Sequence, residues 1–400
     1  MGSSSMAVLL GAMGLVGGVV PAAFMACSSN SDNGFEGAFP DASVDGLSND
    51  AATTDQDARA PLGPPRVYVG SNDGKIRTYS FNEGTYALTL IDTVDAGRNP
   101  SFLAFDSERR YAYSVADQQG QIRAFSIDRS TGKLTPFQTI DSRGAGPTYI
   151  GLDRAGKLAM VANYGGGTIA VFPRLEQGKL GESSATRSFG DTAQTHQIAV
   201  DPTNNFVYVP NKGLDRVAIL RRNGNDLADA GSAPSGDGPR HIDFAPSGHY
   251  AYVIDENGST VSAFTLDSAN GALAQLERVS SLEPGYDGGT NTGAEIQVLP
   301  DGKHLIVSNR GDNSLMVFDI DASSGKLTRR GRVSTQGRRP RHFQVEPTGR
   351  FLFVGNEGSD SVVVMAIDPS TGVPRPVGTP LSVPSPSYVG LIYLQVPRID

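Results

Sequence analysis

The segment "GPRHIDFAPSGHYAYVIDENGSTVSAF" (residues 238–264) decides the fold, because its pattern recurs along the chain. Two short apolar runs, IDF and YAYVI, have the length and composition of β-strands and are separated by a Pro-Ser-Gly turn. Charged side chains stand at both ends of this strand pair. Arg240 and His241 precede the first strand, and Asp255 and Glu256 follow the second.

The pattern of this segment is found seven times between residues 66 and 394. Each copy has a strand such as YAYV, a loop beginning near Asn or Asp, a second strand, a D-x-x-T-G-K-L-type turn, a third strand and a run such as PRHFQVEPTG. Four short strands in a unit of about 45 residues, repeated seven times, predict an all-β fold, a seven-bladed β-propeller. The YAYV-type strands are expected to begin at Val67, Tyr111, Leu158, Phe206, Tyr250, His304 and Phe351.

The end of the chain bears on how the ring of blades closes. The stretch "PSYVGLIYL" (386–394) matches the PRHFQV position of the repeat. We therefore expect the last blade to be nearly complete without a strand from the N-terminus. Whether a strand before Val67 also closes the ring stays open.

Composition and charge agree with this architecture and exclude one class of partner. The 400 residues include 48 Gly and 25 Pro but no Trp, which favours many turns and short strands. The net charge of -8 lies mostly in residues 28–65, so the remainder is nearly neutral. Without a basic stripe, nucleic acid is excluded as a partner. The oligomeric state is not indicated.

The N-terminal residues predict export from the cytoplasm. Cys27, the only cysteine, directly follows an apolar stretch (7–26), and the order is similar to a bacterial lipoprotein signal peptide with "FMAC" as lipobox. We expect residues 1–27 to be the signal peptide, 28–65 a flexible acidic tether and 66–400 the propeller. The membrane would then be reached through the lipid anchor of Cys27 only. The alternative is an uncleaved anchor that spans the bilayer. No Cys/His spacing indicates a metal site.

The repeat places the charged side chains at one mouth of the central channel. In a propeller the start of each innermost strand meets the end of its antiparallel neighbour on the same face. Aligned on the following turn, the seven innermost strands begin with the pairs Ser101/Phe102, Thr148/Tyr149, His196/Gln197, Arg240/His241, Ala294/Glu295, Arg341/His342 and Ser387/Tyr388. Asn residues recur at the neighbouring strand ends, and we interpret them as structural.

Such a rim suits hydrolysis of an activated carbonyl. An Arg can hold the developing oxyanion, and a His or Glu can transfer protons. No Gly-x-Ser-x-Gly elbow is present, so an acyl-enzyme is not expected. The alternative is that these polar side chains only bond loop backbone. Arg240 and Arg310 are expected at a solvent-facing mouth, so that their removal spares folding, and His196 is expected to titrate near neutrality.

Several motifs carry a family resemblance: "VANYGGGTIAVF" (161–172), "GPRHIDFAPSGHYAYVIDE" (238–256), "VSNRGDNSLMVFDID" (307–321) and "PRHFQVEPTGRFLFVGNEGSDSV" (340–362). They resemble the bacterial 6-phosphogluconolactonase-type propellers, a group that includes the fungal carboxymuconate lactonising enzyme. The resemblance implies opening or closure of a small-molecule lactone without an obligatory metal or other cofactor. Two positions depart from the family pattern: Gln194 replaces a His, and Asn211 replaces an Asp.

The resemblance also implies the site residues. The expected catalytic residues are His196, Arg240, Glu256 and Arg310, and the expected substrate-binding residues are His241, Glu295, His342 and Asn309. A second hypothesis remains, in which the propeller is a non-catalytic module that binds a protein or glycan at the cell envelope, because propellers serve many unrelated functions.

Overall fold

The computed structural model describes residues 63–394. The predicted signal peptide with Cys27, and nearly all of the predicted tether, lie outside the described residues. From residue 63 to residue 394 the regular structure consists of β-strands and short 3-10 helices. No helix in this range has the length and apolar character needed to cross a membrane.

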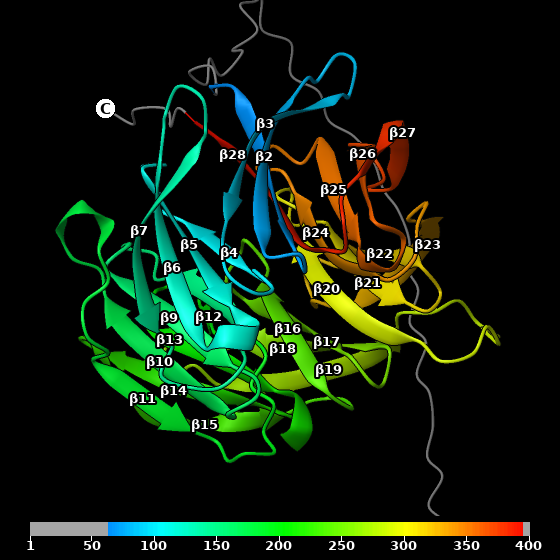
Figure 1. The fold of residues 1–400 in the computed structure, drawn as a ribbon. Helices are drawn as coiled ribbons and strands as arrows, with labels where there is room; N and C mark the ends of the chain where they lie inside the picture. Colours follow the sequence, from blue (N-terminus) through cyan, green and yellow to red (C-terminus); the bar gives the residue numbers. More distant parts are fainter. Residues whose placement is uncertain (1–62, 395–400) are drawn as a thin grey trace, which may run out of the picture. The chain divides into compact units, whose positions relative to one another are not determined.

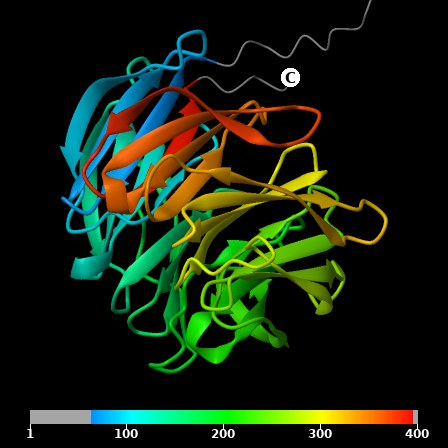
Figure 2. The same ribbon diagram turned by 90° about the vertical axis from the view of Figure 1, so that its right-hand side faces the viewer.

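The strands form seven four-stranded antiparallel sheets, which are the blades of the propeller (Figures 1 and 2). The blades are numbered in chain order, and the strands of each blade are given from the innermost to the outermost. Blade 1 combines β28 (Pro386–Tyr393) with β1 (Pro65–Ser71), β2 (Lys75–Phe81) and β3 (Leu88–Asp95). Blade 2 has β4 (Leu103–Phe105), β5 (Tyr111–Ala116), β6 (Gln121–Ile127) and β7 (Leu134–Asp141). Blade 3 has β8 (Pro147–Leu152), β9 (Leu158–Asn163), β10 (Thr168–Pro173) and β11 (Ala185–Ser188). Blade 4 has β12 (Ala199–Val200), β13 (Phe206–Asn211), β14 (Arg216–Asn223) and β15 (Asp226–Pro234).

The remaining three blades carry most of the predicted site. Blade 5 has β16 (Pro239–Phe244), β17 (Tyr250–Asp255), β18 (Thr260–Leu266) and β19 (Leu273–Ser280). Blade 6 has β20 (Thr292–Val298), β21 (His304–Arg310), β22 (Ser314–Ile320) and β23 (Leu327–Ser334). Blade 7 has β24 (Pro340–Val345), β25 (Phe351–Asn356), β26 (Ser361–Ile367) and β27 (Pro374–Ser382). The 3-10 helices are η1 (Asp117–Gln119), η2 (Glu176–Gly178), η3 (Lys212–Leu214) and η4 (Glu357–Ser359).

The seven-bladed propeller predicted from the repeat is confirmed. Six of the seven YAYV-type strands begin at the predicted residue, and β1 begins at Pro65, two residues before Val67. The D-x-x-T-G-K-L turns also form as expected. In one of them the Asp321 carboxylate accepts hydrogen bonds from the backbone N–H groups of Ser323 and Ser324, and Gly325 has a φ of 70°.

The ring closes differently from the sequence-based expectation. β28 does not complete blade 7, which is already made by β24 to β27. It pairs antiparallel with β1 instead, with Leu391 opposite Val67, and so becomes the innermost strand of blade 1 (Figure 1). The expectation was wrong because the repeat was divided before its YAYV strand, whereas each blade begins with the PRHFQV strand.

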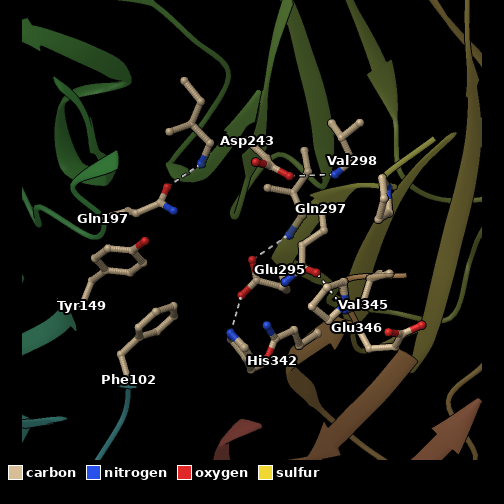
Figure 3. A pocket seen from close by; sticks show the side chains of 15 residues that line it. Phe102, Tyr149, Gln197, Asp243, Glu295, Gln297, Val298, His342, Val345 and Glu346 are labelled. Carbon is tan, nitrogen blue, oxygen red and sulfur yellow. Dashed lines mark hydrogen bonds and ion pairs between the residues drawn. The ribbon is translucent and has the colours of Figure 1, made fainter. Parts of the chain in front are cut away.

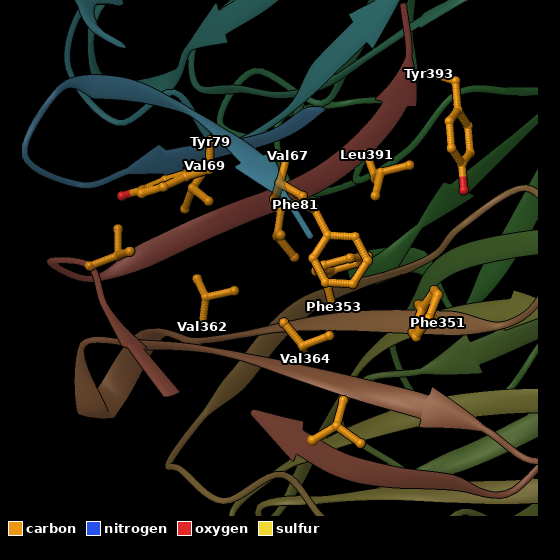
Figure 4. Packing of buried hydrophobic residues seen from close by; sticks show 13 residues of the cluster. Val67, Val69, Tyr79, Phe81, Phe351, Phe353, Val362, Val364, Leu391 and Tyr393 are labelled. Atoms are coloured by element: carbon orange, nitrogen blue, oxygen red, sulfur yellow. The ribbon is translucent and has the colours of Figure 1, made fainter. Parts of the chain in front are cut away.

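Neighbouring blades are joined by buried apolar packing and by a repeated tyrosine contact. Between blades 7 and 1, Leu391 of β28 lies among Phe81, Phe353 and Val364 (Figure 4). In four blades a buried Tyr hydroxyl donates a hydrogen bond to a glycine carbonyl in the next blade along the chain. The four pairs are Tyr68–Gly132, Tyr113–Gly178, Tyr208–Gly271 and Tyr252–Gly325.

A matched pair of Leu→Ala variants tests the closing strand. Leu391 is 1 % exposed in β28, whereas Leu90 is 55 % exposed on β3. Truncating a buried Leu leaves a cavity, so we expect Leu391→Ala to lower the free energy of unfolding by about 2–5 kcal/mol. Leu90→Ala should change it by less than about 0.5 kcal/mol. Both values come from denaturant titration followed by circular dichroism, and equal effects of the two variants would contradict the closure described here.

Candidate active site

The innermost strands of blades 3, 5, 6 and 7 are bulged at the residues predicted to form the rim. The pairing of β16 with β17 skips Arg240, and the pairing of β24 with β25 skips Arg341. Thr148 is skipped in the same way in β8. A bulge sets two consecutive residues opposite one partner, which re-aims their side chains. Arg240 and His241 therefore both have buried side chains with partners on blade 6, where strict alternation would send them to opposite faces.

Glu256, which directly follows β17, is the centre of a charged cluster at the mouth of the channel where the innermost strands begin. Its Oε2 lies 3.1 Å from Arg240 Nε and 3.1 Å from Arg310 Nη2, and its Oε1 accepts a 2.8 Å hydrogen bond from Lys212 Nζ. Each guanidinium also donates to a backbone carbonyl of β20. One carboxylate thus holds three cations from blades 4, 5 and 6 in fixed positions.

The charges of this cluster are strongly perturbed. Burial alone would raise the pKa of Glu256, but Arg310, Arg240 and Lys212 outweigh it and lower the pKa to about 2. Burial, followed by the charge of Arg310, lowers the pKa of Arg240 to about 9. Glu256 is therefore ionised and Arg240 protonated at neutral pH. A carboxylate with so low a pKa is a poor proton carrier, so the proton-transfer role that we considered for Glu256 is not supported.

His196 lies beside this cluster, three residues before the start of β12. Its backbone N–H donates to the Pro210 carbonyl, and its ring centroid lies 5.0 Å from that of His241 and 5.5 Å from that of Tyr164. Burial, followed by the charge of Arg240, lowers the pKa of His196 well below its ordinary value of 6.5. The expectation that His196 titrates near neutrality is therefore wrong. The ring is neutral at pH 7 and can accept a proton.

A second carboxylate, that of Glu295 in β20, binds two histidines. In the aligned innermost strands, Glu295 and both histidines follow the position of Arg240 by one residue. Glu295 Oε1 lies 3.0 Å from His241 Nδ1, and its Oε2 lies 3.2 Å from His342 Nε2. Burial raises the pKa of Glu295 and lowers those of both histidines. Together with Phe102 and Tyr388, these side chains form a packed layer across the channel.

Below this layer the channel opens into a cavity of about 280 Å³ (Figure 3). The innermost strand of each blade has no strand partner on its channel side. Side chains in the walls of the cavity form hydrogen bonds with the backbone of the innermost strand of the next blade. Gln197 accepts the Ile242 N–H at 2.6 Å, and Asp243 accepts the Val298 N–H at 2.7 Å. The cavity therefore has polar walls that are largely occupied by structural bonds, and none of the predicted catalytic residues lines it.

One predicted binding residue is committed to the fold. The Asn309 amide donates to the Ser281 carbonyl at 2.8 Å and to Ser314 Oγ, and it accepts from Ser281 Oγ and Asn291 Nδ2. No hydrogen-bonding capacity remains for a ligand, so we remove Asn309 from the site. Asn163 and Asn356 bond the preceding loop in the same way, which confirms the structural interpretation of these Asn residues.

The predicted quartet is brought together, but its surroundings differ from expectation. Arg240 is 3 % and Arg310 9 % exposed, so they do not lie in a solvent-facing mouth, and we expect their removal to affect folding. Lys212 and Arg341 were not among the site residues predicted from the sequence. The guanidinium of Arg341 is partly exposed and lies 3.9 Å from Glu357. Lys212 and Arg341 both occupy rim positions of the repeat, which was the available signal. Residues 63–394 contain no group of three or more His, Cys, Asp or Glu side chains arranged to hold a metal ion.

Comparisons with known proteins agree with this architecture. A family profile described as "Lactonase, 7-bladed beta-propeller" matches residues 66–391. A Bacillus subtilis protein named 6-phosphogluconolactonase is 33% identical over 295 residues, which cover 69% of this chain and 83% of that protein. A Formosa agariphila protein of the same name is 33% identical over 305 residues, covering 69% and 85%. A solved structure described as the periplasmic gluconolactonase of Pseudomonas aeruginosa has a TM-score of 0.76 at 27% identity, covering 83% of this chain and 99% of that one.

The low pKa of Glu256 predicts a specific acid sensitivity. Because the folded-state pKa of about 2 is below the ordinary 4.5, ionised Glu256 stabilises the fold above pH 4.5, and this contribution is lost as the pH falls toward 2. We expect Glu256→Gln to be less stable than the parent at pH 7 and to lose less stability between pH 4.5 and pH 2. Denaturant unfolding at a series of pH values measures this.

The matched control for this variant is Glu182→Gln. Glu182 forms an exposed ion pair with Arg143. Surface ion pairs contribute little, so its stability at pH 7 should stay within about 1 kcal/mol of the parent. A Glu256→Gln protein with the pH dependence of the parent would contradict the cluster described above.

Proposed function

The chain belongs to the seven-bladed β-propeller lactonase family, and we propose that it hydrolyses a sugar-acid lactone at the cluster of His196, Arg240, Glu256 and Arg310. The observation that carries this proposal is the pair of buried guanidiniums held on one carboxylate beside a neutral imidazole. Oxyanion donors next to a base are the elements that ester hydrolysis by water requires.

The two arginines are assigned to the lactone carbonyl. Contacts within the chain engage Nη1 and Nε of Arg240, and a guanidinium has five N–H groups, so donors remain for a ligand. As water adds to the carbonyl carbon, negative charge grows on the carbonyl oxygen, and fixed N–H donors in a buried site stabilise it. Glu256 keeps both guanidiniums in place and offsets part of their charge. Its role is therefore positioning.

His196 is assigned to proton transfer. The neutral imidazole takes a proton from the attacking water while the oxygen of that water bonds to the carbonyl carbon. The bond between this carbon and the ring oxygen then breaks, and His196 returns the proton to the ring oxygen. The product is a hydroxy acid, which ionises at neutral pH. Since the pKa of His196 lies well below 6.5, the base form persists into mildly acidic solution.

The lactone class follows from the relatives and from the local charge. The curated relatives are named 6-phosphogluconolactonase, and a similar structure is described as a gluconolactonase. Lys212 and Arg341 add positive charge at the partly exposed edge of the cluster. The charge of the site therefore favours an aldonolactone or its phosphate ester, because both yield an anionic product that these cations attract.

We further propose that the protein is exported and held at the membrane through lipid on Cys27. This location is supported by the apolar stretch before Cys27 and by the likeness to a periplasmic gluconolactonase. An exported enzyme meets unphosphorylated aldonolactones more readily than a cytoplasmic sugar phosphate. Among the candidate substrates we therefore favour δ-gluconolactone.

Turnover of the purified full chain tests the proposed function. δ-Gluconolactone, 6-phosphogluconolactone and further lactones are incubated with the protein, and spontaneous opening is subtracted. We expect Arg240→Lys and Arg310→Lys, which keep the charge but lose the planar fork, to lower kcat by about 10²-fold. Arg375→Lys, on the exposed face of β27, is the control and should match the parent.

Because both site arginines are buried, the folding of each variant is checked first by circular dichroism and thermal unfolding. Folded variants that turn over lactones as fast as the parent would contradict the assignment of these arginines. Absence of any turnover above background in the parent would contradict the proposed function and favour a binding module.

Replacing Cys27 tests the anchor. A lipoprotein needs its cysteine for lipidation, and stable anchoring takes more than one acyl chain. We expect Cys27→Ser to move the protein from the membrane fraction to the soluble fraction of the cell envelope, as followed by fractionation and immunoblotting. Membrane retention of Cys27→Ser would favour the uncleaved anchor. Ser28→Ala is the control and should stay with the membrane.

A further inference from the structure

The layer beneath the charged cluster contains a carboxylate–imidazole pair that the proposed mechanism does not yet use. Glu295 accepts a hydrogen bond from His241 Nδ1 at 3.0 Å. When Glu295 is ionised, its carboxylate can only accept, which places the proton on Nδ1 of His241 and a lone pair on its Nε2. Glu295 is itself fixed, because its Oε1 accepts the Ile296 N–H at 3.0 Å and its own N–H donates to Ser308 Oγ. The lone pair therefore has a defined direction.

The two histidines that bind Glu295 differ in their second nitrogen. His342 Nδ1 accepts the backbone N–H of Val389, so both of its nitrogens are used. His241 Nε2 is buried and has no hydrogen-bond partner among the described residues. Buried polar atoms are normally paired, and an exception calls for an explanation such as a role in catalysis. Only His241 keeps an unused acceptor.

The nearest titratable ring to His241 is that of His196. The two ring centroids lie 5.0 Å apart at an interplanar angle of 69°. His196 Nδ1 is also buried without a hydrogen-bond partner among the described residues. Two buried ring nitrogens, one fixed as an acceptor and the other able to donate, thus belong to neighbouring rings and are not bonded to each other, so one bridging water could satisfy both.

We propose that His241, oriented by Glu295, is a positioning residue for His196, whose Nδ1 proton it holds through one bridging water. This inference rests on the proposed function of His196. With its proton on Nδ1, His196 presents the Nε2 lone pair to the attacking water. When Nε2 takes the proton, the positive charge that forms is stabilised through His241 by the Glu295 carboxylate, without any further proton leaving the chain His196–His241–Glu295.

The remaining charges near His241 explain why such a chain is needed. The charged groups that act on His241 besides Glu295 are Arg240, Arg341, Glu256 and Arg310. Three of these four are cations and oppose a positive charge on a histidine. Glu295 is the buried carboxylate that contacts His241 directly, so it counters this opposition at the histidine next to the proton-accepting His196.

The test compares Glu295→Gln with His342→Gln in the full chain. Glu295→Gln removes the negative charge but keeps the shape, and we expect kcat to fall about 10–100-fold with KM within about twofold of the parent. The acid limb of the kcat profile should move to lower pH, because loss of a negative charge near the base lowers the pKa of His196. His342→Gln changes the contact between His342 and Glu295 Oε2 but leaves the hydrogen bond between His241 and Glu295 Oε1 in place. It should keep the pH profile of the parent, whatever its rate.

If Glu295→Gln does not fold, Glu295→Asp, which keeps the charge, should preserve the pH profile at a reduced rate.

Imidazole ¹⁵N NMR supplies a readout that does not depend on turnover. The five histidines can be assigned with single His→Gln variants. We expect His241 to be protonated on Nδ1, and the ¹⁵N signals of His196 to shift in Glu295→Gln but not in His342→Gln. Unchanged His196 signals in Glu295→Gln, or equal kinetic and pH effects of the two variants, would overturn the inference. Absence of lactone turnover in the parent would count against the proposed function, while the NMR result still decides the coupling.

Discussion

The antiparallel pairing of β28 with β1 is the contact on which the remaining structure depends. It joins the two ends of the propeller, so that seven innermost strands converge instead of six. The innermost strands each have one edge without a strand partner. Side chains of neighbouring blades form hydrogen bonds with the backbone groups along this edge. Gln297 binds the backbone of β24 in this way, and Gln344 binds that of β28. The geometry of the channel is therefore set by ring closure and by these bonds together.

Within this frame the site combines groups that are costly to bury. Arg240 and Arg310 lie in the interior, where charged side chains are rarely found unless they are paired, and their partner Glu256 is only partly exposed. A buried ion pair is weak evidence for stability, because desolvation cancels much of the attraction. Three cations around one carboxylate leave an excess of positive charge. This arrangement is better explained by an anionic reaction partner than by a contribution to folding.

The sequence predicted the blades well because their repeat is local. Strand starts such as Tyr250 and turns such as that before Gly325 follow from alternation and from positive φ. The quartet came from the family resemblance, and the aligned rim positions indicated that its members lie on one face. Burial of Arg240 and the coupling of His241 to Glu295 could not be predicted. They depend on bulges and on contacts between blades, which a repeat pattern does not encode.

We propose that lactone chemistry takes place at the charged cluster and not in the cavity below the histidine layer. A crystal structure with bound gluconate, the hydrolysis product of δ-gluconolactone, tests this most directly. We expect the product carboxylate within hydrogen-bond distance of Arg240 and Arg310, with its carboxyl carbon beside His196. Gluconate bound only among Gln197, Asp243 and Gln297 in the lower cavity, or only on the outer strands, would contradict it.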